Sequence, residues 1–198
     1  MDYGDWASRY DEDTQRFGWC APQHVLDTVT ARTSLRSELR VLDLGVGTGQ
    51  CSGPFLEAGA SVVGVDASAS MLEQAARRGA FSELVELELG ARPLGDVLAR
   101  HGKFDVVVAC GVLHFVASLD ALLVELRPLV EPSGVVAMTT IPPQDRAFGP
   151  KTNVVAASTI ATWLHDAGFE VEAQSSFVAY YDQADENDPV TYGLSVAR

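Results

Sequence analysis

Three glycines alternate with other residues in the stretch VLDLGVGTGQ, which covers residues 41–50. Glycine adds no side chain to packing and loses much chain entropy on folding, so such a run marks a backbone that another group approaches closely. The apolar residues before Gly45 indicate a buried strand, and an open α/β sheet binds ligands just beyond the carboxyl ends of its strands. We therefore expect a small-molecule site at Gly45 and Gly47.

The spacing of this loop differs from two phosphate-binding motifs. A dinucleotide fingerprint requires G-x-G-x-x-G, whereas Gln50 occupies the sixth position here. A P-loop requires a lysine after its last glycine, and this loop has none. Asp43, two residues before Gly45, would repel the diphosphate of NAD. It suits a positively charged ligand without phosphates, such as S-adenosylmethionine.

A second acid, Asp66, ends the next apolar run of the chain. An acid at this place can accept hydrogen bonds from both ribose hydroxyls of a nucleoside. Taken alone, an Asp at a strand end serves equally well as a helix cap. Together with Asp43 and the glycine loop, it favours a ligand in which an amino acid is joined to a nucleoside.

Short apolar runs alternate with helical stretches from Leu39 onward, at residues 40–44, 61–65, 84–89, 104–110 and 134–139. Their nearly continuous apolar character is typical of parallel strands that helices cover on both faces. Two further strand-like runs, 169–181 and 189–197, have no helix between them and predict an antiparallel hairpin at one edge. The sequence thus predicts an α/β, Rossmann-like, doubly wound, mostly parallel seven-stranded sheet.

The helices between these strands have readable ends. Ser70 and Glu73 form a possible capping box, and Gly79 lies at the carboxyl end of the same predicted helix. Further helices are predicted over residues 22–31, 119–129 and 158–167. The resulting order of strand, helix, strand, helix supports the doubly wound sheet.

The 198 residues are 47% apolar and 21% charged, which suits a single domain with one core. We expect residues 1–35 to form a helical lid or cap and residues 36–198 to form the core. The net charge of −13 disfavours nucleic acid as a partner. No apolar run approaches the ~20 residues that cross a bilayer, and the acidic N-terminus lacks the features of a signal peptide, so we expect a cytoplasmic protein without membrane attachment.

The three cysteines, Cys20, Cys51 and Cys110, are an odd number without C-x-x-C spacing. They predict free thiols in a reducing cytoplasm and no metal site. Nothing in the sequence decides between a monomer and a homodimer.

These motifs together resemble the class I S-adenosylmethionine-dependent methyltransferase family. VLDLGVGTG matches the first motif of that family, VVGVDASASML the second and FDVVVACGVLHFV the fourth, while RPLVEPSGVVAMTT resembles the fifth strand and the helix before it. The shorter stretch YGDWASRYDED resembles the opening of the Williams–Beuren-region methyltransferase-like subgroup. The resemblance implies S-adenosylmethionine as the cofactor and methyl transfer to oxygen or nitrogen of a small molecule.

The resemblance also implies which residues contact the methionine part of the cofactor. Gly45 and Gly47 would let it lie against the backbone, and Asp43 would hold its ammonium through water. Cys110 would offer its backbone carbonyl to the same ammonium. If the weaker subgroup likeness holds, Tyr10 contacts this end as well.

For the nucleoside part, the resemblance implies that Asp66 takes the ribose and that Ala67 and Met71 pack against adenine. Gly90 and Ala91, after the third strand, would line the adenine edge. The family often has an acid there that binds the adenine amino group, and LGARPL has none. Either backbone groups alone recognise the adenine, or the cofactor is bound less tightly.

His114, in GVLHF, is the candidate general base, because it follows the fourth strand and an unperturbed imidazole accepts a proton near neutral pH. The alternative is a histidine that only packs beside the cofactor. Orientation of the acceptor can supply ~7–11 kcal/mol of the barrier to methyl transfer, so little other machinery is required.

Two further segments carry open alternatives. Tyr3, Trp6 and Tyr10 have helical spacing and form either a lid over the site or an amphipathic helix that packs on the core. The loop IPPQDRAFGPKTN, residues 141–153, is long enough to help form the acceptor pocket. Within it, Arg146 either contacts an acidic substrate or faces solvent.

Three other functions remain open from the sequence. In one, the bound cofactor only shapes a pocket for a cyclisation or rearrangement without methyl transfer. In another, the chain is a non-enzymatic module that binds the cofactor. A nucleotide oxidoreductase is the fourth candidate, and the residue at position 50 argues against it.

Overall fold

The computed structural model describes residues 4–144, 152–182 and 188–198. Its centre is one seven-stranded sheet with the strand order β3-β2-β1-β4-β5-β7-β6. The strands are β1 (Arg40–Leu44), β2 (Ser61–Asp66), β3 (Glu83–Glu86), β4 (Phe104–Ala109), β5 (Val130–Thr140), β6 (Val171–Tyr181) and β7 (Pro189–Ala197). The first five pair in parallel, and β7 pairs antiparallel with both β5 and β6. This confirms the predicted Rossmann-like fold with its antiparallel hairpin at one edge.

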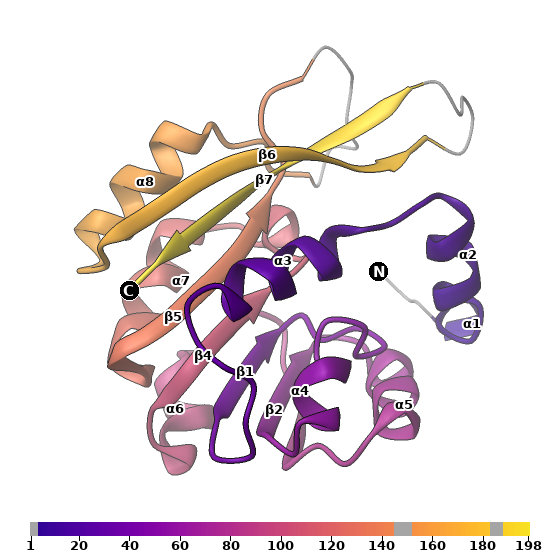
Figure 1. Cartoon of the computed structure of the whole chain (residues 1–198), viewed down its shortest axis with the longest axis horizontal. Coiled ribbons are helices and arrows are strands. Elements are labelled where there is room, and N and C mark those ends of the chain that lie inside the picture. Colours follow the sequence, from indigo (N-terminus) through magenta and orange to yellow (C-terminus); the bar gives the residue numbers. More distant parts are fainter. Residues whose placement is uncertain (1–3, 145–151, 183–187) are drawn as a thin grey trace.

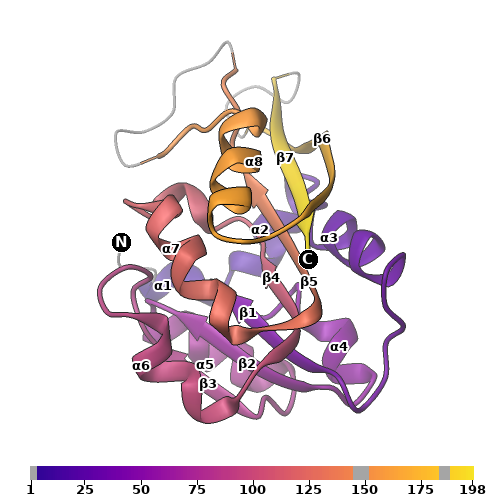
Figure 2. The ribbon, with the colours of Figure 1, turned by 90° about the vertical axis from the view of Figure 1, so that its left-hand side faces the viewer.

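Helices cover both faces of the sheet, with α3 and α4 on one side and α6, α7 and α8 on the other (Figure 2). The α-helices are α1 (Gly4–Ala7), α2 (Tyr10–Arg16), α3 (Ala21–Thr30), α4 (Gly53–Glu57), α5 (Ala69–Arg78), α6 (Leu94–Leu98), α7 (Leu119–Leu126) and α8 (Ala157–Asp166). Three short 3₁₀ turns are η1 (Ala99–His101), η2 (Leu113–Phe115) and η3 (Arg127–Leu129). None of the helices in the described ranges is long and apolar enough to cross a membrane.

The central strands form because their side chains are buried on both faces. Val106, Val107 and Val108 in β4 alternate between two hydrophobic clusters, one under α6–α8 and one under α3 and α4. β-branched residues suit such strands, since they pack well on a pleated surface. The two clusters fix the strand ends of β1 and β4 side by side, and these ends carry the glycine loop and η2.

Several predicted boundaries differ from the structure. The third strand ends at Glu86 rather than Leu89, because its partner β2 ends at Asp66, the residue opposite Glu86. Ser68, not Ser70, caps α5, and it accepts a hydrogen bond from the Met71 N–H. The predicted helix over 119–129 is α7 followed by the 3₁₀ turn η3.

The N-terminal segment is interrupted rather than one helix. The chain turns at Arg9, whose N–H donates to the Trp6 carbonyl, and this turn separates α1 from α2. The Trp6 and Tyr10 rings nevertheless pack edge to face at 4.9 Å, as the helical spacing suggested. In Figure 1 the indigo helices α1 and α2 stand beside α5, and α3 lies across the sheet. Tyr3 lies outside the described residues.

Candidate active site

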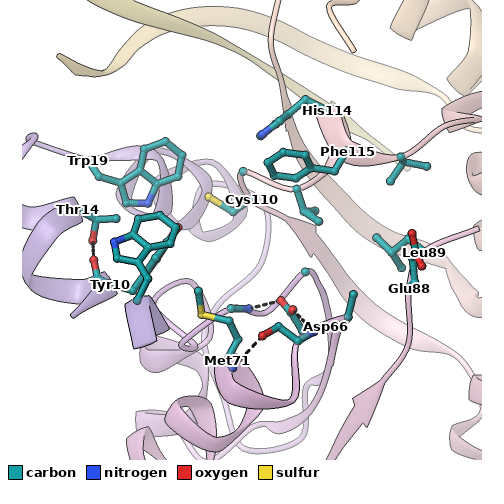
Figure 3. Close-up of a pocket in the computed structure, with 18 of the residues that line it drawn as sticks. Tyr10, Thr14, Trp19, Asp66, Met71, Glu88, Leu89, Cys110, His114 and Phe115 are labelled. Atoms are coloured by element: carbon teal, nitrogen blue, oxygen red, sulfur yellow. Dashed lines mark hydrogen bonds between the residues drawn. The ribbon is translucent and has the colours of Figure 1, made fainter. Parts of the chain in front are cut away.

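One pocket of about 480 Å³ lies beyond the carboxyl ends of β1, β2 and β4. Its volume is within the about 300–1,000 Å³ that small-molecule sites occupy. Eight predicted site residues line it together: Tyr10, Gly45, Gly47, Asp66, Ala67, Met71, Cys110 and His114. Figure 3 shows Asp66 and Met71 on one side, Tyr10, Thr14 and Trp19 on a second, and His114 and Phe115 on a third.

The glycine loop has a backbone conformation that residues other than glycine rarely adopt. Gly45, Gly47 and Gly49 all have positive φ, at 69°, 53° and 82°. A Cβ on Gly45 would lie 2.3 Å from the Val112 side chain, whereas a Cβ on Gly47 would meet nothing within 4 Å. Gly45 is therefore required by packing against the β4 side, and Gly47 leaves bare backbone facing the pocket.

Asp66 joins the glycine loop to the start of α5. Its Oδ2 accepts from the Gly47 N–H at 2.8 Å, and its Oδ1 accepts from the Ser68 N–H at 2.9 Å. Partial burial raises its pKa, and these backbone donors oppose that rise. Each carboxylate oxygen has about two acceptor positions, so both oxygens keep capacity for a further donor in the pocket.

Asp43 lies under the loop rather than on the pocket surface. Its side chain is 1% exposed, and Oδ2 accepts a hydrogen bond of 2.6 Å from the Ser52 hydroxyl. Oδ1 is buried without any hydrogen-bond partner, and burial raises the pKa of this carboxyl to about 7. An unpaired buried acceptor is costly, so a cation close to the loop would offset an existing penalty.

Leu87, Glu88 and Leu89, which follow β3, also line the pocket. Gly90 and Ala91, predicted for the adenine edge, are not among its lining residues. The prediction missed Glu88 because it extended the strand to Leu89 and searched for an acid only afterwards. The signal was present: Glu88 is the last acid before the turn in which the Ala91 N–H donates to its carbonyl at 3.0 Å.

The pocket carries negative but no positive side chains among its described lining residues. Asp66 and Glu88 are the carboxylates, and neither a lysine nor an arginine lines it. A phosphate would meet no cation here, while a positively charged ligand would meet two acids. The residues that are present therefore fit S-adenosylmethionine and do not fit a dinucleotide.

His114 is held in the 3₁₀ turn η2, directly after β4. It is 7% exposed, its ring lies 4.0 Å from that of Phe115, and its Nδ1 is buried without a hydrogen-bond partner. Burial lowers its pKa to about 4, so the imidazole is neutral at pH 7. A neutral ring with the proton on Nε2 has a free lone pair on Nδ1.

Five aromatic side chains from distant parts of the chain line this pocket, and we call them the aromatic wall: Trp19, His114, Phe115, Tyr180 and Tyr192. The Trp19 ring lies 5.3 Å from Tyr192 and 5.9 Å from Tyr180. The rings of His114 and Tyr192 are 6.0 Å apart. Neither Trp19 nor the two tyrosines was predicted, because no local pattern relates the N-terminal segment to the hairpin.

Gly111 lies under the Trp19 ring and has a φ of 72°. A Cβ there would lie 3.1 Å from the Trp19 ring, so glycine allows the indole to approach the end of β4. The Gly111 N–H donates to the Thr139 hydroxyl at 2.8 Å, which fixes this backbone. Cys110 precedes it and lines the pocket, and all three cysteines are free, as predicted.

The N-terminal helices are tied to the glycine loop through Asp11. Its Oδ1 accepts from the Thr48 hydroxyl at 2.5 Å and from Gln50 Nε2 at 2.9 Å, and its other oxygen pairs with Arg78. Gln50 Nε2 also donates to the Thr14 hydroxyl at 2.9 Å, and Arg78 Nε donates to the Thr48 carbonyl at 2.7 Å. Gln50, where a dinucleotide motif has glycine, thus connects the loop to the cap together with Thr48. We call these five residues the cap latch.

The loop after β5 is anchored at both ends beside the pocket. Gln144 exchanges two hydrogen bonds with the Thr191 backbone, at 2.7 and 2.9 Å. The Asn153 N–H donates to the His114 carbonyl at 2.8 Å. Arg146 lies outside the described residues, so the two alternatives for it stay open.

The chain was compared with known proteins and solved structures. Residues 42–136 match the model of a methyltransferase domain family. A ubiquinone biosynthesis O-methyltransferase from Chelativorans sp. (strain BNC1) is 34% identical over 127 residues, which cover 64% of this chain and 49% of the relative. The chain thus aligns with about half the length of this relative.

Two solved structures share the fold. The magnesium protoporphyrin IX methyltransferase of Synechocystis PCC 6803, with bound S-adenosylmethionine, superposes with a TM-score of 0.69 at 20% identity, covering 94% of this chain and 82% of the other. A (4+2)-cyclase superposes with a TM-score of 0.68 at 18% identity, covering 89% of this chain and 80% of the other. At these identities the likeness concerns the fold alone.

The fold, the glycine loop and the acid at the end of β2 agree with the matched domain model. Over residues 42–136 the chain is similar to methyltransferase domains, as the resemblance to the class I S-adenosylmethionine-dependent methyltransferase family implies.

Proposed function

We propose that this protein transfers a methyl group from S-adenosylmethionine to an oxygen or nitrogen atom of a small-molecule acceptor. The observation that carries the proposal is that one pocket has two unlike ends. One end offers bare backbone and two carboxylates, and the other offers aromatic rings. The first suits a cationic nucleoside, and the second leaves space for an acceptor beside it.

At the cofactor end, Gly47 would let the methionine part approach the backbone, because no Cβ occupies that space. Asp66 would accept hydrogen bonds from the ribose hydroxyls with the acceptor positions that Gly47 and Ser68 leave free. Ala67 and Met71 line the same end and would pack against the adenine. We assign the adenine edge to Glu88 rather than to Gly90 and Ala91.

Asp43 would act on the ammonium group through the loop and water, because it does not line the pocket. Its unpaired Oδ1 supports this role, since a nearby cation favours the charged form of a buried carboxyl. The carbonyl of Cys110 and the ring of Tyr10, which line the same pocket, remain the proposed neighbours of the methionine end.

Bound S-adenosylmethionine would supply an electrophilic methyl group to the acceptor's oxygen or nitrogen, with S-adenosylhomocysteine as the leaving group and the acceptor's proton released to bulk solvent. The chain's own part is to orient the acceptor and exclude water. His114 would accept a hydrogen bond from the acceptor at Nδ1, which has no partner in the protein. Because its pKa is lowered to about 4, His114 is a weak base at neutral pH. We therefore propose that it orients the acceptor rather than removes its proton.

The cap over this site would be the segment 1–35, as part of a single domain that continues through 36–198. The cap latch supports this division, because it connects α2 to the glycine loop itself. The net charge of −13 and the three free thiols support a cytoplasmic protein that acts on a small molecule rather than on nucleic acid.

A cyclisation or rearrangement that uses the bound cofactor only to shape the pocket is the second candidate. The shared fold with a (4+2)-cyclase and the weak basicity of His114 favour it. A non-enzymatic module is less well supported, because the pocket continues past the cofactor end into the aromatic wall.

The test is calorimetry of the purified chain with S-adenosylmethionine, S-adenosylhomocysteine and NAD, followed by an assay for S-adenosylhomocysteine release with candidate acceptors. We expect the two sulfur nucleosides to bind and NAD not to bind. Uptake of NAD alone would contradict the proposal. Conversion of an acceptor without any release of S-adenosylhomocysteine would support the second candidate instead.

A further inference from the structure

The aromatic wall limits what kind of acceptor the pocket takes, and this inference rests on the proposed function. We propose that the acceptor is a flat, uncharged aromatic molecule that stacks or packs on this wall and presents a hydroxyl or N–H group to His114. Neither an anionic acceptor nor a bulky aliphatic one of similar size fits the same surface.

The shape of the wall supports a flat acceptor. Trp19, Tyr180 and Tyr192 pack against one another with centroid separations of 5.3–6.2 Å and interplanar angles of 59–79°. Rings this close contact each other and leave no space for a cation among them, unlike a cage that surrounds an ammonium group. Their outer faces and edges instead offer the offset or edge-to-face contacts that another aromatic ring prefers.

The charges around the wall support an uncharged acceptor. Among the described residues neither lysine nor arginine lines the pocket, so a carboxylate or phosphate on the acceptor would lose its hydration without gaining a partner from them, while Arg146 lies outside the described residues. A cationic acceptor would lie beside the positive charge that a bound sulfonium brings. Both kinds of charge therefore cost free energy at this end.

One polar atom on the wall has no hydrogen-bond partner among the described residues. His114 is 7% exposed, and its buried Nδ1 accepts no hydrogen bond. Because this atom has almost no accessible surface, a turn of the His114 ring would have to bring it to the pocket, where a hydroxyl or N–H on the acceptor ring would offset the cost of its desolvation. The acceptor class follows from the combination: a ring for the wall and one donor for His114.

The experiment measures binding of three probes of one size to the full chain saturated with S-adenosylhomocysteine, by calorimetry at pH 7.5. The probes are 2-naphthol, which is flat and neutral, 2-naphthoate, which is flat and anionic, and decahydro-2-naphthol, which is neutral but not flat. We expect 2-naphthol to bind at least tenfold more tightly than either of the others. Equal or tighter binding of 2-naphthoate or decahydro-2-naphthol would overturn the inference.

Variants locate the binding surface. Tyr192→Leu should lower the affinity for 2-naphthol at least fivefold, whereas Tyr192→Phe should keep most of that affinity. The affinity for S-adenosylhomocysteine should stay within twofold in both variants. Tyr181→Leu is the matched control, since Tyr181 lies on the same hairpin, is 47% exposed and does not line the pocket. Tyr192 is only 4% exposed, so Tyr180→Leu serves as a second variant if Tyr192→Leu does not fold.

The two proposals fail in different ways. If S-adenosylhomocysteine itself does not bind, the proposed function is wrong. Two results would show that only the acceptor class is wrong while S-adenosylhomocysteine binds. The first is that 2-naphthol binds no more tightly than the other two probes. The second is that Tyr192→Leu and Tyr180→Leu both bind 2-naphthol as the unaltered chain does.

Discussion

The two ends of the pocket are built in different ways. The end proposed for the cofactor consists mainly of backbone and strand ends that are close in sequence, from Gly45 to Met71. The end proposed for the acceptor consists of side chains that come from the α2–α3 connection, η2 and the β6–β7 hairpin. A backbone site depends on the conformation of single residues, whereas a side-chain site distributes its contacts over several rings. A single substitution at the first end should therefore remove most of the ligand binding there, whereas a single substitution at the second end should only weaken it.

The sharpest test of this difference is Gly45→Ala. The new Cβ would lie 2.3 Å from Val112, on a residue with φ of 69°. Strain and overpacking together should cost about 2–5 kcal/mol of folding free energy and remove measurable cofactor binding. Thermal unfolding and calorimetry measure the two effects. Gly95→Ala, where a Cβ meets nothing, is the control, and a Gly45→Ala chain of normal stability would refute the packing role.

Asp66→Ala comes next in expected size. It removes both the proposed ribose contact and the bonds to the Gly47 and Ser68 N–H groups. Affinity for S-adenosylmethionine should fall at least tenfold, because charge-assisted hydrogen bonds are each worth about 1.5–3 kcal/mol. Asp105→Ala removes a carboxylate that accepts the Arg40 N–H away from the pocket, and it should leave affinity unchanged. Unaltered affinity in Asp66→Ala would contradict the ribose role.

His114→Gln tests the acceptor end. Turnover of a good acceptor should fall about tenfold while the Kd for S-adenosylmethionine changes less than threefold, since His114 is proposed to contact the acceptor. With a pKa of about 4, the unaltered histidine should produce no inflection in kcat between pH 6 and 8. His165→Gln, at an exposed position, is the control. A kcat inflection near pH 6.5 that disappears in His114→Gln would instead show a general base of ordinary pKa.

Asp43→Asn should raise the stability of the ligand-free protein at pH 8 and lower its affinity for S-adenosylmethionine. Burial raises the folded-state pKa of Asp43 from 3.8 to about 7, so its contribution to stability is lost as pH rises from about 4 to about 7. An uncharged amide at this position avoids that loss, so the ligand-free variant should melt higher than the unaltered protein at pH 8 and equally at pH 3. Its affinity for S-adenosylmethionine should fall severalfold at pH 8.

Asp120→Asn, at an exposed position on α7, controls for the change in net charge. If Asp43→Asn binds the cofactor normally at pH 8, the carboxylate has no part in holding the ammonium.

The smallest effect is expected from the cap latch. Asp11→Asn weakens the pair with Arg78, which is partly exposed and therefore worth at most about 1 kcal/mol. Dissociation of S-adenosylhomocysteine, followed by stopped-flow fluorescence, should become about threefold faster. Asp27→Asn, which alters a carboxylate bonded to Gln23 on α3, should not change the rate. An unchanged rate in Asp11→Asn would mean that the cap does not retain the cofactor.

The sequence was sufficient for the fold and for most of the cofactor end. Nearly continuous apolar runs identified the central strands, because strands buried on both faces are apolar throughout, while the mostly exposed edge strand β6 was identified from a strand-like run with no helix between it and β7. The apolar pattern misplaced the end of β3, where pairing with β2 decides the boundary, and Glu88 was missed as a result.

The sequence by itself determined the part of the pocket that depends on local backbone conformation. Glycines at 45 and 47, an acid at 43 and an acid at 66 lie in two short strand-to-loop junctions, and their spacing alone indicated the ligand class. Only the tertiary structure decided the acceptor end, because Trp19, Tyr180 and Tyr192 meet through antiparallel pairing of the hairpin and docking of the N-terminal segment. Contacts between residues so far apart in sequence leave no periodic signal in the chain.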